Sequence, residues 1–420
     1  ILKNVILTSR SNSNNYIYEM LDIRRKYKIK DYYVTNYKLT PKDISNAIKN
    51  DEFLFFYQPI LSLRSGKIDS AEALIRWKKD NGELVQACHF IPYAEQTGLI
   101  TEITKAMIPR FLEDLKKINQ QDNTIVSSLN ISSKDMAQEK FVPTLLKLIN
   151  DSGVDPSKIK IELTESSALT LSIERLLDIA ELKAHGIELA IDDFGTGHAT
   201  FEKLKNLPFN TLKIDQTMTS QALSTPDGLT LLDHSINLAH QLQMTSVAEG
   251  VETDSLMKYL MGIGCEHIQG YYISKPLELS SFIEFINNKH DWDIMQHGQI
   301  YKAIIDFTDW QRKVYSSLYI SSDNMRIVEF EAEHSPAGKF LFEVVNTADI
   351  QLFNKLNTSY KKSYEVAKIL LNAKSSGDQN LIEKLLPDFF DTCGKVSALL
   401  QKAYAKECQH GLLKHSSFRK

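Results

Sequence analysis

The chain has 420 residues, of which 43% are hydrophobic and 24% charged, and its formal net charge is −4 at pH 7. This is the composition of a soluble globular protein with room for one large domain and a smaller one. The small net charge gives no reason to expect a nucleic-acid polymer or an anionic membrane as partner. No apolar run approaches the ~18 residues that span a bilayer. We therefore expect a cytoplasmic protein. Because the chain begins at Ile1 rather than Met, an upstream membrane or sensor segment is the alternative.

Residues 1–50 are interpreted as a lead-in segment. Their weak pattern of short strands and helices, the last helix over Thr40–Lys49, resembles the final third of a receiver domain. Thr8 or Ser9 and Lys38 would then lie near the usual switch positions. The part that would carry the phosphorylated aspartate is absent, so we favour a lead-in over a receiver remnant.

Strands and helices alternate over residues 51–290. The predicted strands are Phe53–Leu63, Ser70–Trp77, Thr124–Ile131, Lys158–Leu163, Glu188–Ile191, Thr211–Ile214, Ser246–Ala248 and His267–Ile273. Eight strands with helices between them predict an α/β fold, a (β/α)8 TIM-like barrel. The link through Gly66 is short and hairpin-like, which would make the first strand antiparallel. An open doubly wound sheet is the competing architecture, but no G-x-G-x-x-G motif supports it.

The stretch Ile191–Gly197, which reads I-D-D-F-G-T-G, ends a buried strand on two adjacent carboxylates. Adjacent acids repel each other and resist burial unless a divalent cation lies between them and other ligands. The alternative is that Asp192 or Asp193 caps a following helix. The neighbouring strands help to choose between the two.

Each predicted strand carries a polar residue, usually near its end. In chain order these are Gln58, Glu72, Asn130, Glu162, Asp192 with Asp193, Lys213, Glu249 and Gln269. Any one of them could be a cap, a salt bridge or a surface charge. Because barrel active sites gather at strand C-termini, the full set predicts a single site at the mouth of the barrel.

The residue types in this set indicate the chemistry. Carboxylates and a carboxamide without histidine favour Mg²⁺ or Mn²⁺ over zinc. Two such cations, about 3.5–4 Å apart, are used to generate hydroxide and to stabilise in-line displacement at phosphorus. A lysine beside them can hold the nucleophile and offset phosphoryl charge. The set therefore predicts metal-assisted phosphodiester hydrolysis.

Nine motifs lie within about 240 of the 420 residues: Y-Q-P-I (57–60), E-A-L-I-R-W (72–77), F-I-P-Y-A-E-Q-T-G-L-I (90–100), N-I-S (130–132), E-L-T-E-S (162–166), D-D-F-G-T-G (192–197), L-K-I-D (212–215), A-E-G-V-E-T (248–253) and Q-G-Y-Y-I-S-K-P (269–276). Together they resemble the EAL family of bacterial phosphodiesterases, which open cyclic di-GMP to linear pGpG. They follow one another in the order and spacing of the family.

The resemblance implies a role for each matching residue. It implies that the two cations are held by Glu72, Asn130, Glu162, Asp192, Asp193 and Glu249. Lys213 would position the attacking water, and either Glu249 or the metals alone would act as base. Glu165 would hold the loop after Asp193. Behind the ligands, Glu252 and Gln269 would provide support, and substrate would be contacted by Gln58, Leu74 and Arg76.

The sequence departs from the family pattern after the glycine turn, where His198–Phe201 replaces Y-S-S-L. Members of the family use this loop and its helix as a dimer contact, so the departure puts the pairing of an expected homodimer in doubt. All the metal ligands and Lys213 are present, which favours an enzyme. The alternative is a catalytically weak or inactive module that binds cyclic di-GMP.

Residues 291–420 carry apolar residues at helical spacing and predict an all-α bundle of about four helices, with a short one near Phe340–Val345. Trp310, G-K-F at 338–340 and G-D at 377–378 resemble the chemoreceptor zinc-binding family. Its three histidines and one cysteine correspond here to Thr308, Ser335, Tyr360 and Tyr364, which are poor zinc ligands. We therefore expect a metal-free regulatory or dimerisation bundle whose tyrosines pack into the core. An unrelated helical tail is the alternative.

Overall fold

The computed structural model describes residues 39–195, 204–205, 207–222, 226–290, 292, 298–319 and 350–416. Most of the expected lead-in segment (residues 1–38), the loop His198–Phe201 and the expected short helix near Phe340–Val345 lie outside these residues. Within the described ranges, no helix is both long and apolar enough to cross a membrane. The chain forms two compact units, one of Ile1–Leu54 with Ile75–Ile103 and one of Phe55–Leu74 with Thr104–Lys420.

The first unit contains the predicted helix after Thr40, which is confirmed as α3 (Pro41–Lys49). Asp43 begins it by accepting a hydrogen bond from the Thr40 backbone N–H at 2.7 Å. This unit also holds β3 (Leu84–Gln86) and α4 (Ile91–Thr97), neither of which was predicted. Its small core forms around Phe90, whose ring centroid lies 5.3 Å from that of Phe53 and 5.9 Å from that of Trp77.

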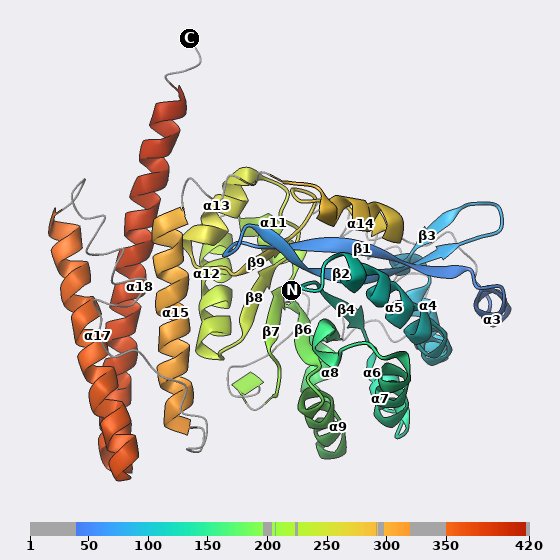
Figure 1. Cartoon of the computed structure of the whole chain (residues 1–420), viewed down its shortest axis with the longest axis horizontal. Helices are drawn as coiled ribbons and strands as arrows, with labels where there is room; N and C mark the ends of the chain where they lie inside the picture. The colour runs from blue at the N-terminus through green and yellow to red at the C-terminus, as the bar shows by residue number, and fades with distance from the viewer. Residues whose placement is uncertain are drawn as a thin grey trace, which may run out of the picture. The chain divides into compact units, whose positions relative to one another are not determined.

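Eight strands close into a barrel, as predicted (Figure 1). They are β1 (Phe53–Ser62), β2 (Lys67–Lys78), β4 (Val126–Asn130), β5 (Ile159–Thr164), β6 (Glu188–Phe194), β7 (Thr211–Ile214), β8 (Thr245–Ala248) and β9 (His267–Gln269). Neighbours from β2 through β4 to β9 pair in parallel. The expected exception is confirmed, because β1 pairs antiparallel with β9. A two-residue strand, β10 (Leu277–Glu278), extends the sheet beside β1.

The parallel strands are buried on both faces, which explains their nearly continuous apolar runs. Residues Leu189–Ile191 of β6, for example, are fully buried. The helices between and after the strands are α5 (Ile100–Gln121), α6 (Ser133–Met136), α7 (Phe141–Ser152), α8 (Glu165–Leu169), α9 (Ile173–Ala184), α11 (Gln216–Ala222), α12 (Pro226–Gln241), α13 (Asp254–Gly262) and α14 (Leu279–Asn287). They supply the helices that the sequence predicts between the strands.

The last predicted strand is too long, since β9 ends at Gln269 rather than Ile273. At Gly270 the backbone comes so close to Val251 that a Cβ atom would lie 2.2 Å from its carbonyl oxygen. The Ile273 N–H then donates to the Gly270 carbonyl at 3.0 Å, which closes a turn. Only glycine fits this contact, and the turn that follows it ends the strand although the apolar run continues.

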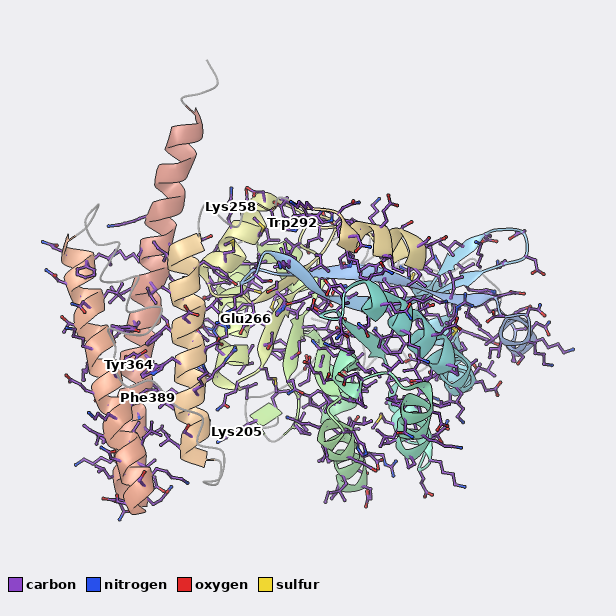
Figure 2. The ribbon with its side chains drawn as sticks, viewed as in Figure 1. Lys205, Lys258, Glu266, Trp292, Tyr364 and Phe389 are labelled. Carbon is purple, nitrogen blue, oxygen red and sulfur yellow. The ribbon has the colours of Figure 1, made fainter. Side chains whose placement is uncertain are left out.

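Beyond the barrel, α15 (Gly298–Tyr319), α17 (Ile350–Ser376) and α18 (Gln379–Ser416) pack together (Figure 1). Trp310 stacks on Tyr364 with centroids 3.9 Å apart, and Phe389 of α18 lies beside them (Figure 2). The predicted packing of the two tyrosines is confirmed, because both are buried and the Tyr360 hydroxyl donates to the Tyr364 hydroxyl at 3.1 Å. These three helices account for the described part of the predicted bundle.

Candidate active site

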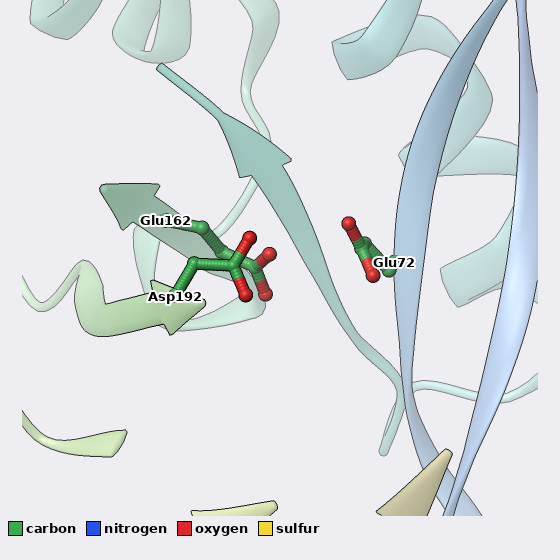
Figure 3. A group of neighbouring side chains, drawn as sticks. All are labelled: Glu72, Glu162 and Asp192. Atoms are coloured by element: carbon green, nitrogen blue, oxygen red, sulfur yellow. The ribbon is translucent and has the colours of Figure 1, made fainter. Parts of the chain in front are cut away.

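Three carboxylates from different strands meet inside the barrel. Glu72 of β2 faces Glu162 of β5 and Asp192 of β6, whose carboxylates lie side by side (Figure 3). One oxygen from each lies within 4.8 Å of the others. A second group with the same spacing joins Asp192 to Asp193 and Glu249. The two groups share Asp192, so the barrel holds two adjoining sets of oxygen donors.

Lys213 of β7 lies at the centre of these carboxylates and is only 1% exposed. Its Nζ atom lies 2.7 Å from Glu162, 2.8 Å from Glu249, 3.0 Å from Asp192 and 3.2 Å from Glu72. Burial alone would lower the lysine pKa, but these four carboxylates together raise it well above its usual value. The side chain is therefore held as an ammonium ion.

The cluster carries more acidic groups than one lysine can balance. Burial, with the nearby charges of Glu72 and Asp192, raises the pKa of Glu162 to about 7. Burial and the adjacent Asp192 raise the pKa of Asp193 to about 6. Burial raises the pKa of Glu249 well above its usual value despite the neighbouring lysine. Without further positive charge, some of these carboxyls hold their protons near neutral pH.

The donor set fits divalent cations. Glu162 Oε1 is buried and has no hydrogen-bond partner among the described residues, which leaves it available as a ligand. Hard carboxylate oxygens without a histidine or cysteine in either group are the ligands that hard cations prefer. A divalent cation would supply the positive charge that the cluster lacks.

Two carboxamides donate to Glu72, and a third is linked to one of them. Asn130 donates to Glu72 Oε1 and Gln269 donates to Glu72 Oε2, both at 2.8 Å. Gln269 also donates to Gln58 at 3.1 Å, and Gln58 donates to the Ser274 carbonyl at 3.2 Å. Although burial raises the pKa of Glu72, Lys213 and these amide donors bring it below its usual value. The carboxylate is thereby held ionised and in a fixed orientation.

Glu165 contacts the backbone that follows β6. It is the first residue of α8, is 1% exposed, and accepts a hydrogen bond from the Gly195 N–H at 3.0 Å. This bond holds the backbone directly after Asp193, which has a left-handed φ of 54°. Asp192 and Asp193 lie within β6, so the alternative in which they cap a helix is wrong.

The structure does not bring every predicted site residue to the cluster. Glu252 is exposed and makes no hydrogen bond or ion pair to the cluster within the described ranges, so its expected supporting contact is not seen. Leu74 and Arg76 follow Glu72 at alternate positions of β2, and both are half-buried. The Arg76 guanidinium donates to the Ile75 carbonyl at 2.9 Å.

Asp215 lies in the L-K-I-D stretch, but the sequence predicts no role for it. Asp215 follows β7 two residues after Lys213 and is 7% exposed. Its charge contributes to the raised pKa of Asp193. The alternation of side chains along β7 from Lys213 was the signal that could have identified it.

An α/β barrel in which four carboxylates surround one buried lysine, with Asp193 as a fifth carboxylate beside them, defines a class of barrel proteins with an acidic mouth. The chain belongs to the EAL family, since the EAL domain model matches residues 42–276.

Several curated proteins are similar to this chain. The cyclic di-GMP phosphodiesterase PdeL of Escherichia coli K12 is 30% identical over 281 residues, covering 66% of this chain and 74% of PdeL. The signaling protein YkoW of Bacillus subtilis is 31% identical over 275 residues, covering 66% of this chain and 34% of YkoW. The chain thus spans only about a third of some of these relatives.

Solved structures with the same barrel are also similar. The PaMucR phosphodiesterase in complex with c-di-GMP aligns with a TM-score of 0.55 at 28% identity, covering 57% of this chain and 98% of that one. The cGMP-bound EAL enzyme Bd1971 aligns with a TM-score of 0.56 at 30% identity, covering 59% of this chain and 68% of that one.

Proposed function

We propose that the barrel hydrolyses cyclic di-GMP to linear pGpG with two divalent cations, Mg²⁺ or Mn²⁺. The observation that carries the proposal is the pair of adjoining oxygen-donor groups that share Asp192 and surround Lys213. Relatives named as cyclic di-GMP phosphodiesterases, and a similar structure in complex with c-di-GMP, supply the substrate.

The proposed ligands are the side chains gathered at the barrel mouth: Glu72, Asn130, Glu162, Asp192, Asp193 and Glu249. Bound there, the cations would activate a water and neutralise charge on the phosphoryl oxygens. The substrate would be contacted by Gln58, Leu74 and Arg76, and the fork of Arg76 suits a phosphate oxygen.

The chain's own groups prepare the site for this reaction. The Lys213 ammonium donates toward the attacking water and remains protonated throughout, since its pKa is far above neutral. Glu249 is placed beside it and can accept the water's proton; the alternative is that no side chain acts as base. Glu165 fixes the turn after Asp193, and Gln269 fixes Glu72, so neither ligand has to reorganise.

Purified protein incubated with cyclic di-GMP and Mg²⁺ or Mn²⁺ tests the proposal. We expect pGpG as product, and inhibition by Ca²⁺, whose looser coordination suits a tight two-metal site poorly. Glu72→Ala should abolish turnover, whereas Glu113→Ala on the exposed face of α5 should not change it. Binding of cyclic di-GMP without any pGpG would favour the alternative, a binding module. Near-native turnover by Glu72→Ala would contradict the assignment of the site.

We further propose a lead-in over 1–50, a catalytic barrel over 51–290 and a regulatory or dimerisation bundle over 291–420, with the protein acting as a homodimer in the cytoplasm. The tyrosine pair in the bundle core supports a metal-free bundle, because phenols replace the ligands that zinc prefers. Light scattering of the full chain tests the dimer. Elemental analysis tests the metal: stoichiometric zinc that is lost on mutating His297 or His334 would contradict this proposal.

A further inference from the structure

Helix α15 contacts the barrel at the end where the parallel strands begin. Tyr301 donates to the Cys265 carbonyl at 2.7 Å, and Arg312 donates to the Met244 carbonyl at 2.8 Å. Met244 comes immediately before β8, and Cys265 comes two residues before β9. The same two strands end at Gln269 and directly before Glu249. The helix therefore holds the starts of the strands whose other ends carry site residues.

Glu266 also links helix α15 to the barrel (Figure 2). Its carboxylate accepts from the backbone N–H of Ser246 at 2.9 Å and from the Ser246 hydroxyl, and lies 2.6 Å from the Arg312 guanidinium. Its backbone carbonyl accepts from the Leu63 N–H at 2.9 Å. One buried residue thus joins β8, the turn after β1 and helix α15.

A second link runs to the same turn. Arg64, between β1 and β2, forms ion pairs with Asp306 at 3.1 Å and with Asp309. Strands β1 and β2 carry Gln58 and Glu72. Arg64 is 53% exposed, so solvent weakens this link, whereas the Glu266–Arg312 pair is largely shielded.

Helices α15 and α18 pack closely against the segment that leads into β9. A Cβ atom on Gly262 would lie 2.8 Å from the ring of Tyr404 of α18, and one on Gly264 would lie 3.0 Å from Ile304 of α15. Both glycines belong to the segment that leads into β9. Their lack of side chains lets the bundle approach the barrel closely, which argues for a built contact rather than a loose tail.

We propose that Arg312 is a positioning residue for the metal site, acting through Glu266 on strands β8 and β9. β8 has only four residues, so a shift at Ser246 is passed along a single short strand to Glu249. β9 has three, and it carries Gln269, which orients Glu72. The C-terminal bundle would then set the geometry of the metal ligands from the opposite end of the barrel. This inference rests on the proposed function for its catalytic consequence.

The test uses the full chain with two changes that remove both charges of the pair at once, Glu266→Gln with Arg312→Met, so that neither partner is left as an unpaired buried charge. The glutamine keeps an acceptor for Ser246 and for His240, which lies 3.6 Å from the Glu266 carboxylate. Mn²⁺ affinity is measured by calorimetry, cyclic di-GMP turnover by pGpG release, and folding by circular dichroism. We expect a folded protein in which Mn²⁺ affinity and kcat each fall about 10-fold, at the low end for groups behind metal ligands. KM should change less than kcat.

Arg312→Lys is the conservative variant, because it keeps a cation opposite Glu266 and avoids an unpaired buried charge. It should fold and recover most of the Mn²⁺ affinity. The matched control is Lys362→Met with Asp388→Asn, an exposed ion pair between α17 and α18, and it should leave both readouts unchanged. Folded variants at Glu266 and Arg312 with native Mn²⁺ affinity and native kcat would overturn the inference. A wild-type protein that binds Mn²⁺ but releases no pGpG would instead overturn the proposed function, while Mn²⁺ affinity would still report on Arg312.

Discussion

Lys213 is a buried lysine that is held against four carboxylates. We predict that Lys213→Ala lowers kcat at least 100-fold, the scale expected when one positioned donor is removed from a charged transition state. Its effect on KM should be small, because the role lies in the transition state. Steady-state kinetics with Lys117→Ala, a surface change on α5, as control would check this. A KM increase that accounts for the whole loss would contradict the assigned role.

Glu162 makes metal binding depend on pH. Its pKa of about 7 means that a proton must leave before the carboxylate can bind a cation. We predict that Mn²⁺ affinity rises about 10-fold between pH 6 and pH 8, one proton being released over that interval. Calorimetry across this range measures it. Glu162→Gln, which has no proton to lose, should bind more weakly with a flatter profile. If the Mn²⁺ affinity of the wild-type protein does not depend on pH, Mn²⁺ binding does not displace the Glu162 proton.

At the residue scale, the sequence predicts the members of the site better than their contacts. The strand-end acids and Lys213 meet because parallel strands bring their C-terminal ends together. Glu252 shares a motif with Glu249, yet it lies beyond the end of β8, and no period fixes the direction of its side chain there. The contacts of Lys213 with four acids were also not predictable, since they depend on side-chain directions across the barrel.

At the scale of elements, burial explains which predictions succeed. Strands β5 to β8 are buried on both faces, so their apolar runs identify them. The error at β9 has a different cause, because the close approach of Gly270 to Val251 ends the strand while the apolar composition continues. The two-residue strand β10 and the short helices α8 and α11 depend on tertiary contacts more than on local period. Such contacts leave little signal in the sequence.

The packing of α15 against α17 depends on Tyr364, which is 4% exposed and stacked on Trp310. We predict that Tyr364→Ala destabilises the bundle by about 3–5 kcal/mol, as for other large aromatic truncations in cores. Tyr364→Phe keeps the ring and should lose only about 1 kcal/mol, with the hydrogen bond to Tyr360. Denaturant unfolding followed by tryptophan fluorescence measures both. The exposed Tyr271→Ala serves as control. Equal losses for the Ala and Phe variants would show that the stacked ring is not the main contribution.

At the scale of the whole molecule, the acidic cluster links metal binding to stability. In the folded chain Glu162 and Asp193 titrate near 7 and 6, above the values near 4 that they have when unfolded. Between about pH 4 and pH 7 these two carboxyls bind more protons in the native state than in the unfolded state. Their contribution to the free energy of unfolding therefore falls as pH rises. Cations that bind the ionised cluster would reverse the loss. The site therefore costs stability in the metal-free protein, and the cost is greatest above pH 7.

Thermal unfolding with and without Mn²⁺ should show this linkage. At 100 times its Kd, one bound Mn²⁺ adds about 2.7 kcal/mol, which raises Tm by about 3 °C for a chain of this size. We expect the increase to be larger at pH 8 than at pH 6, because a protonated Glu162 competes with the metal at the lower pH. The paired change Glu162→Gln with Asp193→Asn removes two of the crowded charges. That variant should melt at a higher temperature than the metal-free wild type at pH 8 and should respond little to Mn²⁺. A wild-type Tm that does not change with Mn²⁺ at pH 8 would show that the cluster binds no cation in the folded protein.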